Sequence, residues 1–93
     1  MNTFEITGKV IEFLGSKKIG EKTTKEDYLI SFGKENKNGK RNNAVVSVFS
    51  FNKEKMDIQN VEEGKIYKFT LIVDGRQLAN KMWTNNLKVI NIQ

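Results

Sequence analysis

The chain has 93 residues, 38% of them hydrophobic, so its length suits a single domain with one core over residues 1–93. Cysteine and histidine are both absent, which excludes disulfides, zinc sites with thiolate or imidazole ligands, and the commonest nucleophile and general base. Sixteen basic residues against eleven acidic ones give a net charge of +5, a balance that favours a polyanionic partner.

The first half of the sequence carries three runs with strand-like alternation. Phe4, Ile6, Gly8 and Val10 share one parity, and we expect this strand to continue to Leu14, bending near Gly15 where the pattern blurs. A lysine-bearing loop is expected next. The sequence places that loop at Gly15–Thr24, the second strand at Lys25–Gly33 and the third at Ala44–Phe51.

A basic turn separates the second and third strands. Asn38-Gly39 is a strong hairpin signal, and Lys34–Asn43 carries four bases and one acid. Asn52–Glu63, by contrast, carries two bases and four acids. We therefore expect one end of the molecule to be positive and another end to be negative.

The second half adds one short helix and two strands. Lys53–Asn60 is the one convincing helical stretch, and Lys65–Asp74 alternates most regularly of all. A second basic hairpin loop follows at Gly75–Lys81, before a last strand at Met82–Ile92. Three strands, a helix and two strands predict an all-β fold, a five-stranded OB-fold Greek-key barrel with one short helix between strands three and four.

The sequence offers no convincing catalytic or metal site. Gly15 and Gly20 have the spacing of a phosphate-binding loop, but Glu21 follows where a lysine is required. The adjacent Glu62 and Glu63 diverge in a strand or turn and cannot converge on one bond. We expect a protein without catalytic activity, metal or cofactor.

Binding of a single strand requires aromatic faces for bases and cations for phosphates. Tyr28 and Phe49 suit a stacking role, although most aromatic residues in a barrel of this size belong to the core. Phe51 lies where the third strand ends, so it can sit at the rim. Leu87 and Val89 share the parity of Trp83 while Ile90 and Ile92 take the other, so we expect this strand to bend or bulge between the two sets, and parity leaves Trp83 open between core and groove. The candidate nucleic-acid contacts are Tyr28, Lys40, Arg41, Phe49, Phe51, Lys53, Arg76, Lys81 and Trp83.

Two stretches carry a family resemblance. Val45–Lys53, followed by Val61–Tyr67, resembles the third and fourth strands of bacterial and phage single-stranded DNA-binding proteins. Gly75–Gln77 and Lys81–Thr84 are similar to the arginine-plus-tryptophan hairpin of a small OB family found in Bacteroidetes-type bacteria and their phages.

The resemblance implies that Arg76 and Trp83 contact nucleic acid, with Phe51 and Lys53 as further contacts. Typical bacterial members carry an acidic tail that recruits partner enzymes, whereas Gln93 here follows the last strand, which implies a minimal or phage-type member. It further implies a homo-oligomer in the cytoplasm of a bacterial or phage-infected cell.

Together these observations predict sequence-tolerant binding of single-stranded DNA in replication or recombination. An RNA-binding OB domain is one alternative, because RNA bases stack on the same side chains. A phage module that binds or inhibits a host protein is the other. No apolar run approaches the roughly 20 residues of a membrane helix, and Met1–Glu5 lacks the features of a signal peptide, so we expect a soluble, intracellular protein with no membrane partner.

Overall fold

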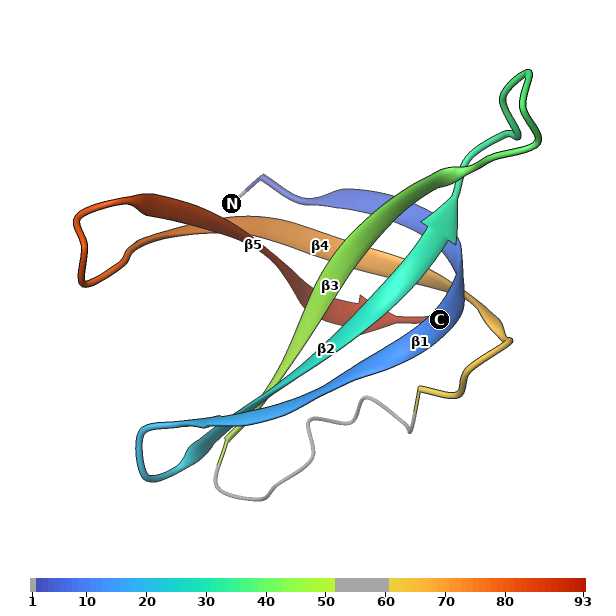
Figure 1. Ribbon diagram of the computed structural model, residues 1–93. Helices are drawn as coiled ribbons and strands as arrows, with labels where there is room; N and C mark the ends of the chain where they lie inside the picture. Colours follow the sequence, from blue (N-terminus) through green and yellow to red (C-terminus); the bar gives the residue numbers. More distant parts are fainter. Residues whose placement is uncertain (1, 52–60) are drawn as a thin grey trace.

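The computed structural model describes residues 2–51 and 61–93, which form one closed, five-stranded sheet (Figure 1). The sheet closes in the order β1-β2-β3-β5-β4, with β4 pairing back onto β1. All neighbours are antiparallel except β3 and β5. The strands are β1 (Phe4–Ile19), β2 (Thr23–Phe32), β3 (Asn42–Phe51), β4 (Ile66–Gln77) and β5 (Trp83–Ile92).

The expected all-β fold with five strands is confirmed, while the helix expected at Lys53–Asn60 lies outside the described residues. In the described part of the chain, no helix is long and apolar enough to cross a membrane.

Strand β1 is longer than its apolar pattern and bends as expected. Its pairing with β2 shifts between Val10 and Glu12 and again between Phe13 and Gly15, and Gly15 has a φ of 123°. The expected loop at 15–24 is wrong, because β1 continues to Ile19 and only residues 20–22 form the turn. Ladder hydrogen bonds hold this extension without apolar alternation, so hydrophobic periodicity did not reveal it.

The core fills the inside of the closed sheet with side chains from the inner face of each strand. Gly8 is buried among these side chains, and a Cβ there would lie 3.0 Å from the Ser31 carbonyl oxygen, so a side chain would require β1 and β2 to move apart by a few tenths of an ångström. The fully buried side chains are Val10, Ile30, Val46, Phe69, Leu71 and Val89.

A bulge in β5 reconciles the two parities of its sequence. Val89 pairs with Leu71 and Asn91 pairs with Thr70, so Ile90 is the additional residue. Val89 is fully buried, whereas Ile90 is 37% exposed. The expected bulge between the two apolar sets is therefore confirmed.

Two hairpins extend beyond the core on one side of the molecule. The β1–β2 arm, residues 15–27, pairs as far as Ile19 and Thr23, and the β4–β5 arm, residues 74–86, pairs as far as Gln77 and Trp83. Both arms extend to the left in Figure 1, and the β2–β3 hairpin projects in the opposite direction.

Candidate nucleic-acid interface

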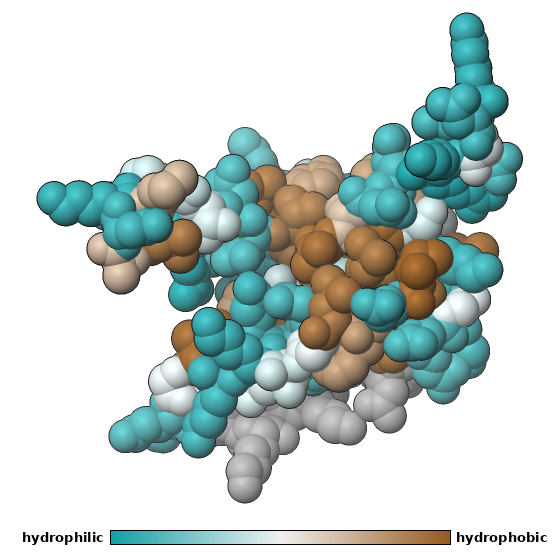
Figure 2. All heavy atoms as spheres, in the orientation of Figure 1, coloured by the Kyte–Doolittle hydropathy of each residue, from teal (hydrophilic) through white to brown (hydrophobic). Residues whose placement is uncertain are grey.

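An open groove lies between the two arms because β3 and β5 pair over only two positions. Val46 pairs with Leu87 and Ser47 pairs with Lys88, and no further pair joins these strands. Beyond Ser47, β3 follows β2 toward one arm, while β5 follows β4 into the other (Figure 1). Figure 2 shows the resulting gap, with hydrophilic and hydrophobic side chains mixed along both arms.

Phe49 is the aromatic side chain that this groove presents. It alternates with the buried Val46 and Val48 and so lies on the outer face of β3, where it is partly exposed. Arg76 Cζ lies 5.7 Å from the ring centroid of Phe49, and Lys88 Nζ lies 5.3 Å from it. Both distances fall within the range of a cation–π interaction. Three strands therefore bring one aromatic ring and two cations together.

Arg76 is held in place by its neighbour on the same face of β4. Its Nε donates to Asp74 Oδ2 at 3.1 Å, and the two side chains are about half and one-third exposed. An exposed pair of this kind contributes at most about 1 kcal/mol to stability. It does, however, orient the guanidinium, whose remaining donors suit phosphate oxygens.

A polar network crosses from β2 to β3 and β5 beside Phe49. Ser47, only 2% exposed, donates from Oγ to Asp27 Oδ1 at 2.6 Å. Lys25 Nζ lies 3.6 Å from Asp27 Oδ1 and donates to Asn86 Oδ1 at 3.4 Å. Lys25 is also the ladder partner of Phe49. These contacts add a third cation to the groove and compensate the charge of Asp27.

The tip of the β4–β5 arm is an ordered turn with exposed apolar side chains. Leu78 N donates to Met82 O at 2.7 Å, and Lys81 N donates to Leu78 O at 2.9 Å. Lys81 adopts a φ of 67°, the one positive value at a non-glycine residue in the described chain. The exposed fractions of Leu78, Met82 and Trp83 are 49%, 63% and 70%.

Trp83 lies outside the core, although it shares parity with the inward-facing Leu87. The arm carries Trp83 past the end of the barrel, so the same face of β5 is buried at Val89 and solvated at Trp83. Arg76 pairs with Thr84 and Gln77 pairs with Trp83, which places Arg76 and Trp83 on opposite faces of the arm. Of the two alternatives that parity left open, the structure has the exposed one.

Tyr28 is a core residue and does not reach the groove. It is 8% exposed, and its ring packs 5.2 Å from that of Phe13. Its hydroxyl donates to Glu26 Oε2 at 3.0 Å. Burial, reinforced by this hydrogen bond and by the charge of Glu26, raises the pKa of Tyr28 to about 12.

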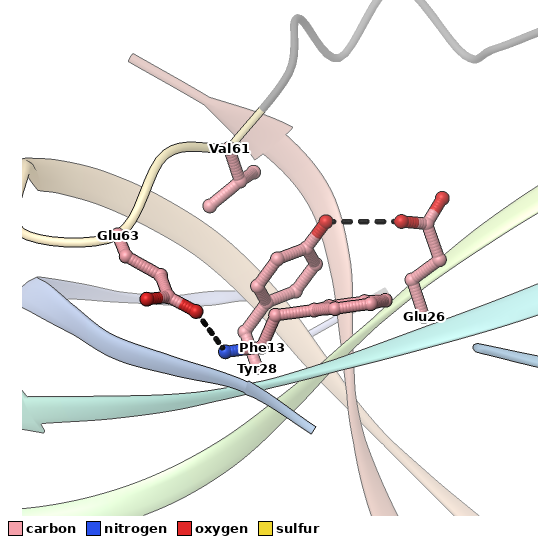
Figure 3. A pocket seen from close by; sticks show the side chains of 5 residues that line it. All are labelled: Phe13, Glu26, Tyr28, Val61 and Glu63. Carbon is pink, nitrogen blue, oxygen red and sulfur yellow. Dashed lines mark hydrogen bonds between the residues drawn. The ribbon is translucent and has the colours of Figure 1, made fainter. Parts of the chain in front are cut away.

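A pocket of about 320 Å³ opens beside Tyr28 (Figure 3). It lies on the opposite face of β2 from Lys25 and the groove, because Tyr28 and Lys25 have opposite parity in this strand. Glu63 Oε1 in this pocket accepts a hydrogen bond from Phe13 N at 3.0 Å. The carboxylates of Glu26 and Glu63 make this pocket unfavourable for a polyanion. The residues that line it are Phe13, Glu26, Tyr28, Val61 and Glu63.

The remaining sequence-predicted contacts are not gathered at the groove. Lys40 and Arg41 lie at the β2–β3 tip, beyond Asn42, which is about 23 Å along β3 from Phe49 at roughly 3.3 Å per residue. The backbone of Phe51 ends β3 opposite Thr23. Lys53 lies outside the described residues.

Sequence reasoning missed Lys25, Lys88 and Asn86 as parts of this site. The sequence contained one usable signal, because Lys88 stands between the apolar Leu87 and Val89 and so had to face outward. Parity did not show that β5 runs parallel to β3, and that pairing places Lys88 beside Phe49.

Comparison with known proteins gives no family assignment. No protein-family model matches the chain, and no curated protein sequence is significantly similar to it.

Proposed function

We propose that this protein binds single-stranded DNA through the groove between its two arms, without sequence preference and without chemistry. The observation that carries the proposal is the outward ring of Phe49 with Arg76 and Lys88 directed at it. Such a cluster combines the two elements that single-strand binding requires, a π face for bases and cations for phosphates. Sequence tolerance follows because every base has a π face.

The arrangement of the strands supports an OB-type Greek-key barrel, in agreement with the resemblance to small single-stranded DNA-binding proteins. OB domains bind oligonucleotides on the face of strands two and three, between the loops that join strands one and two and strands four and five. Here Phe49 and Lys25 lie on that face of β2 and β3, and the two arms contain the corresponding loops. Replication or recombination is the process in which we place this activity.

The proposed binding step exchanges partners at Phe49. Arg76 and Lys88 occupy the surroundings of the ring in the free protein. An incoming strand offers phosphates, which form stronger charge-assisted contacts with these cations than an exposed ring does. The cations then move to the phosphates and a base stacks on Phe49. A strand long enough to pass around the tip of the β4–β5 arm reaches Lys81 and then Trp83, which lies on the other face of the arm from Arg76.

The test is a titration with fluorescent oligo(dT), compared with a duplex of the same length. We expect tighter binding of the single strand. Phe49→Leu, which retains apolar volume but removes the π face, should weaken oligo(dT) binding by about 1–3 kcal/mol, a roughly 5- to 150-fold change in Kd. Phe13→Leu is the matched control, because Phe13 is 41% exposed but lies by the acidic pocket.

Equal affinity for duplex and single strand would contradict the proposal, as would equal effects of Phe49→Leu and Phe13→Leu. A competition between DNA and RNA oligomers of one sequence decides between the DNA ligand and the RNA alternative, because RNA bases can stack on the same ring.

A further inference from the structure

The tip of the β2–β3 hairpin is a second basic surface, at the opposite end of these strands from the groove. It carries Lys34, Lys37, Lys40 and Arg41 against the single acid Glu35, and all of these residues are exposed. Arg41 Nε lies 4.0 Å from Glu35 Oε1, a long and solvated contact that leaves the net charge of the tip strongly positive.

Hydrogen bonds hold the backbone of the tip in one turn conformation, from which the cationic side chains extend. Asn36 Oδ1 accepts from the backbone N–H groups of Asn38 and Lys40, at 2.9 and 3.0 Å. Asn36 N donates to Lys40 O at 2.7 Å, and Gly39, with a φ of 75°, donates to Asn36 O at 3.0 Å. These hydrogen bonds fix the backbone on both sides of the turn, so binding at the tip loses less conformational entropy than binding by a flexible loop would.

A continuous surface connects this tip with the groove. The outward ladder of β2 and β3 runs from Lys25–Phe49 through Asp27–Ser47 and Leu29–Val45 to Ser31–Asn43. Val45 is 45% exposed and Leu29 is partly exposed, which offers an apolar strip on which bases can lie. Figure 2 shows hydrophobic side chains over the middle of β2 and β3.

The electrostatics of this ladder permit a polyanion to follow it. Its one carboxylate, Asp27, is engaged by Ser47 and by Lys25. Strand β1 flanks the ladder with two bases and one acid. Lys17 pairs with Lys25, Glu12 with Leu29 and Lys9 with Ser31. The ladder therefore adds no net negative charge between two cationic ends.

We infer that one single strand binds along this ladder from the groove to the β2–β3 tip, so that Phe49 and Arg41 contact the same molecule. This inference rests on the proposed function and adds the path that the bound strand follows and the length that it needs. The two ends are separated by about 23 Å of β3, the span from Phe49 to Asn42. A strand of a few nucleotides fills the groove alone, whereas a longer one reaches the tip.

The test measures affinity against oligo(dT) length, with oligomers of about 4 and about 12 nucleotides, toward the two ends of the range of OB site sizes. Lys40→Gln with Arg41→Gln should weaken binding of the longer oligomer about tenfold at low salt and make its log–log salt slope less negative by about 1.4, the value for two phosphates at roughly 0.7 each. Binding of the shorter oligomer should change less than about twofold.

Two further variants isolate the path. Lys65→Gln with Lys68→Gln makes the same change in net charge at the start of β4, where the chain pairs with β1, and should leave both affinities near the wild-type values. Val45→Glu places a carboxylate on the exposed strip and should selectively weaken the longer oligomer.

Each failure has a distinct signature. An unchanged affinity of the Lys40/Arg41 variant for the longer oligomer would overturn the path and leave the groove intact, provided that Phe49→Leu still weakens the shorter one. Equal weakening at both lengths would reduce the tip to a general electrostatic effect. Two short oligomers bound per protein, with the longer one gaining nothing in affinity, would mean two independent strands. Loss of the Phe49 effect at both lengths would defeat the proposed function itself.

Discussion

Lys81 provides a test in which stability and binding are expected to change in opposite directions. Its φ of 67° lies in the left-handed region, where a side chain with a Cβ costs about 1–2 kcal/mol. Lys81→Gly removes that cost, but glycine adds about 0.4–1 kcal/mol of backbone entropy to the unfolded chain. The net expectation is a gain of about 0.5–1 kcal/mol in the free energy of unfolding.

Among residues 2–51 and 61–93, the side chain of Lys81 has no hydrogen bond or ion pair that this substitution would remove. The hydrogen bonds at this position use its backbone, with Lys81 N donating to Leu78 O and Gln77 Nε2 donating to Lys81 O. A gain of this size should raise Tm by about 2–8 °C, since 1 kcal/mol corresponds to about 4–8 °C in a domain of this length. Differential scanning calorimetry measures the shift.

The same substitution should weaken DNA binding if the ammonium contacts a phosphate. The log–log salt slope for oligo(dT) should become less negative by about 0.7, the value for one phosphate. Lys81→Ala is the matched control, because it removes the charge and keeps the Cβ in the left-handed region, so it should show the same binding loss without the gain in Tm. A lower Tm for Lys81→Gly, or an equal gain for Lys81→Ala, would refute the reasoning.

The other predictions concern fluorescence, salt and pH. Trp83 is 70% exposed, so its fluorescence emission should be that of a solvated indole, and oligo(dT) should quench it. Trp83→Ala should weaken binding by about 1–3 kcal/mol with little change in Tm. Emission that does not respond to DNA would remove Trp83 from the interface. Three groove cations, together with Lys81 at the tip of the β4–β5 arm, predict a salt slope near −3 for an oligo(dT) too short to reach the β2–β3 tip. The groove cations are Lys25, Arg76 and Lys88. Fluorescence anisotropy measures the slope, and a slope near zero would exclude phosphate contacts. Because folding raises the pKa of Tyr28 from 10.0 to about 12, its neutral phenol contributes stability below pH 10. This contribution is lost as the pH rises from 10 through 12. Urea unfolding should therefore show a steeper loss of stability above pH 10 for the wild type than for Tyr28→Phe, and parallel curves would contradict the buried phenol.

Much of the strand arrangement could be predicted from the sequence, because burial imposes a two-residue period. The alternation at Phe4–Val10 and at Tyr67–Val73 identified two strands, and Asn38-Gly39 identified the hairpin between β2 and β3. The boundaries were less accurate where strands leave the core. Gly75–Gln77 was expected in a loop but belongs to β4, because an arm held by ladder hydrogen bonds requires no apolar pattern.

The candidate site was predictable only in part, because its members lie on separate strands. Phe49 and Arg76 were identified by residue type and come together in the structure, 5.7 Å apart. Tyr28 is aromatic like Phe49 and could equally stack on a base, yet its side chain lies on the inner face of the sheet and is buried. Residue type indicates what a side chain can bind, whereas the face of the sheet decides whether a ligand can reach it.

The sequence by itself determined the strand content, the basic β2–β3 turn and the bulge required between Leu87 and Ile90, since each follows from local periodicity or turn chemistry. Tertiary structure alone decided the parallel pairing of β3 with β5, which places Lys88 beside Phe49, and the separation of that cluster from Lys40 and Arg41. It also decided the exposure of Trp83, whose parity with Val89 is fixed by sequence. Burial depends on whether another part of the chain covers a face, and that depends on contacts between residues far apart in sequence.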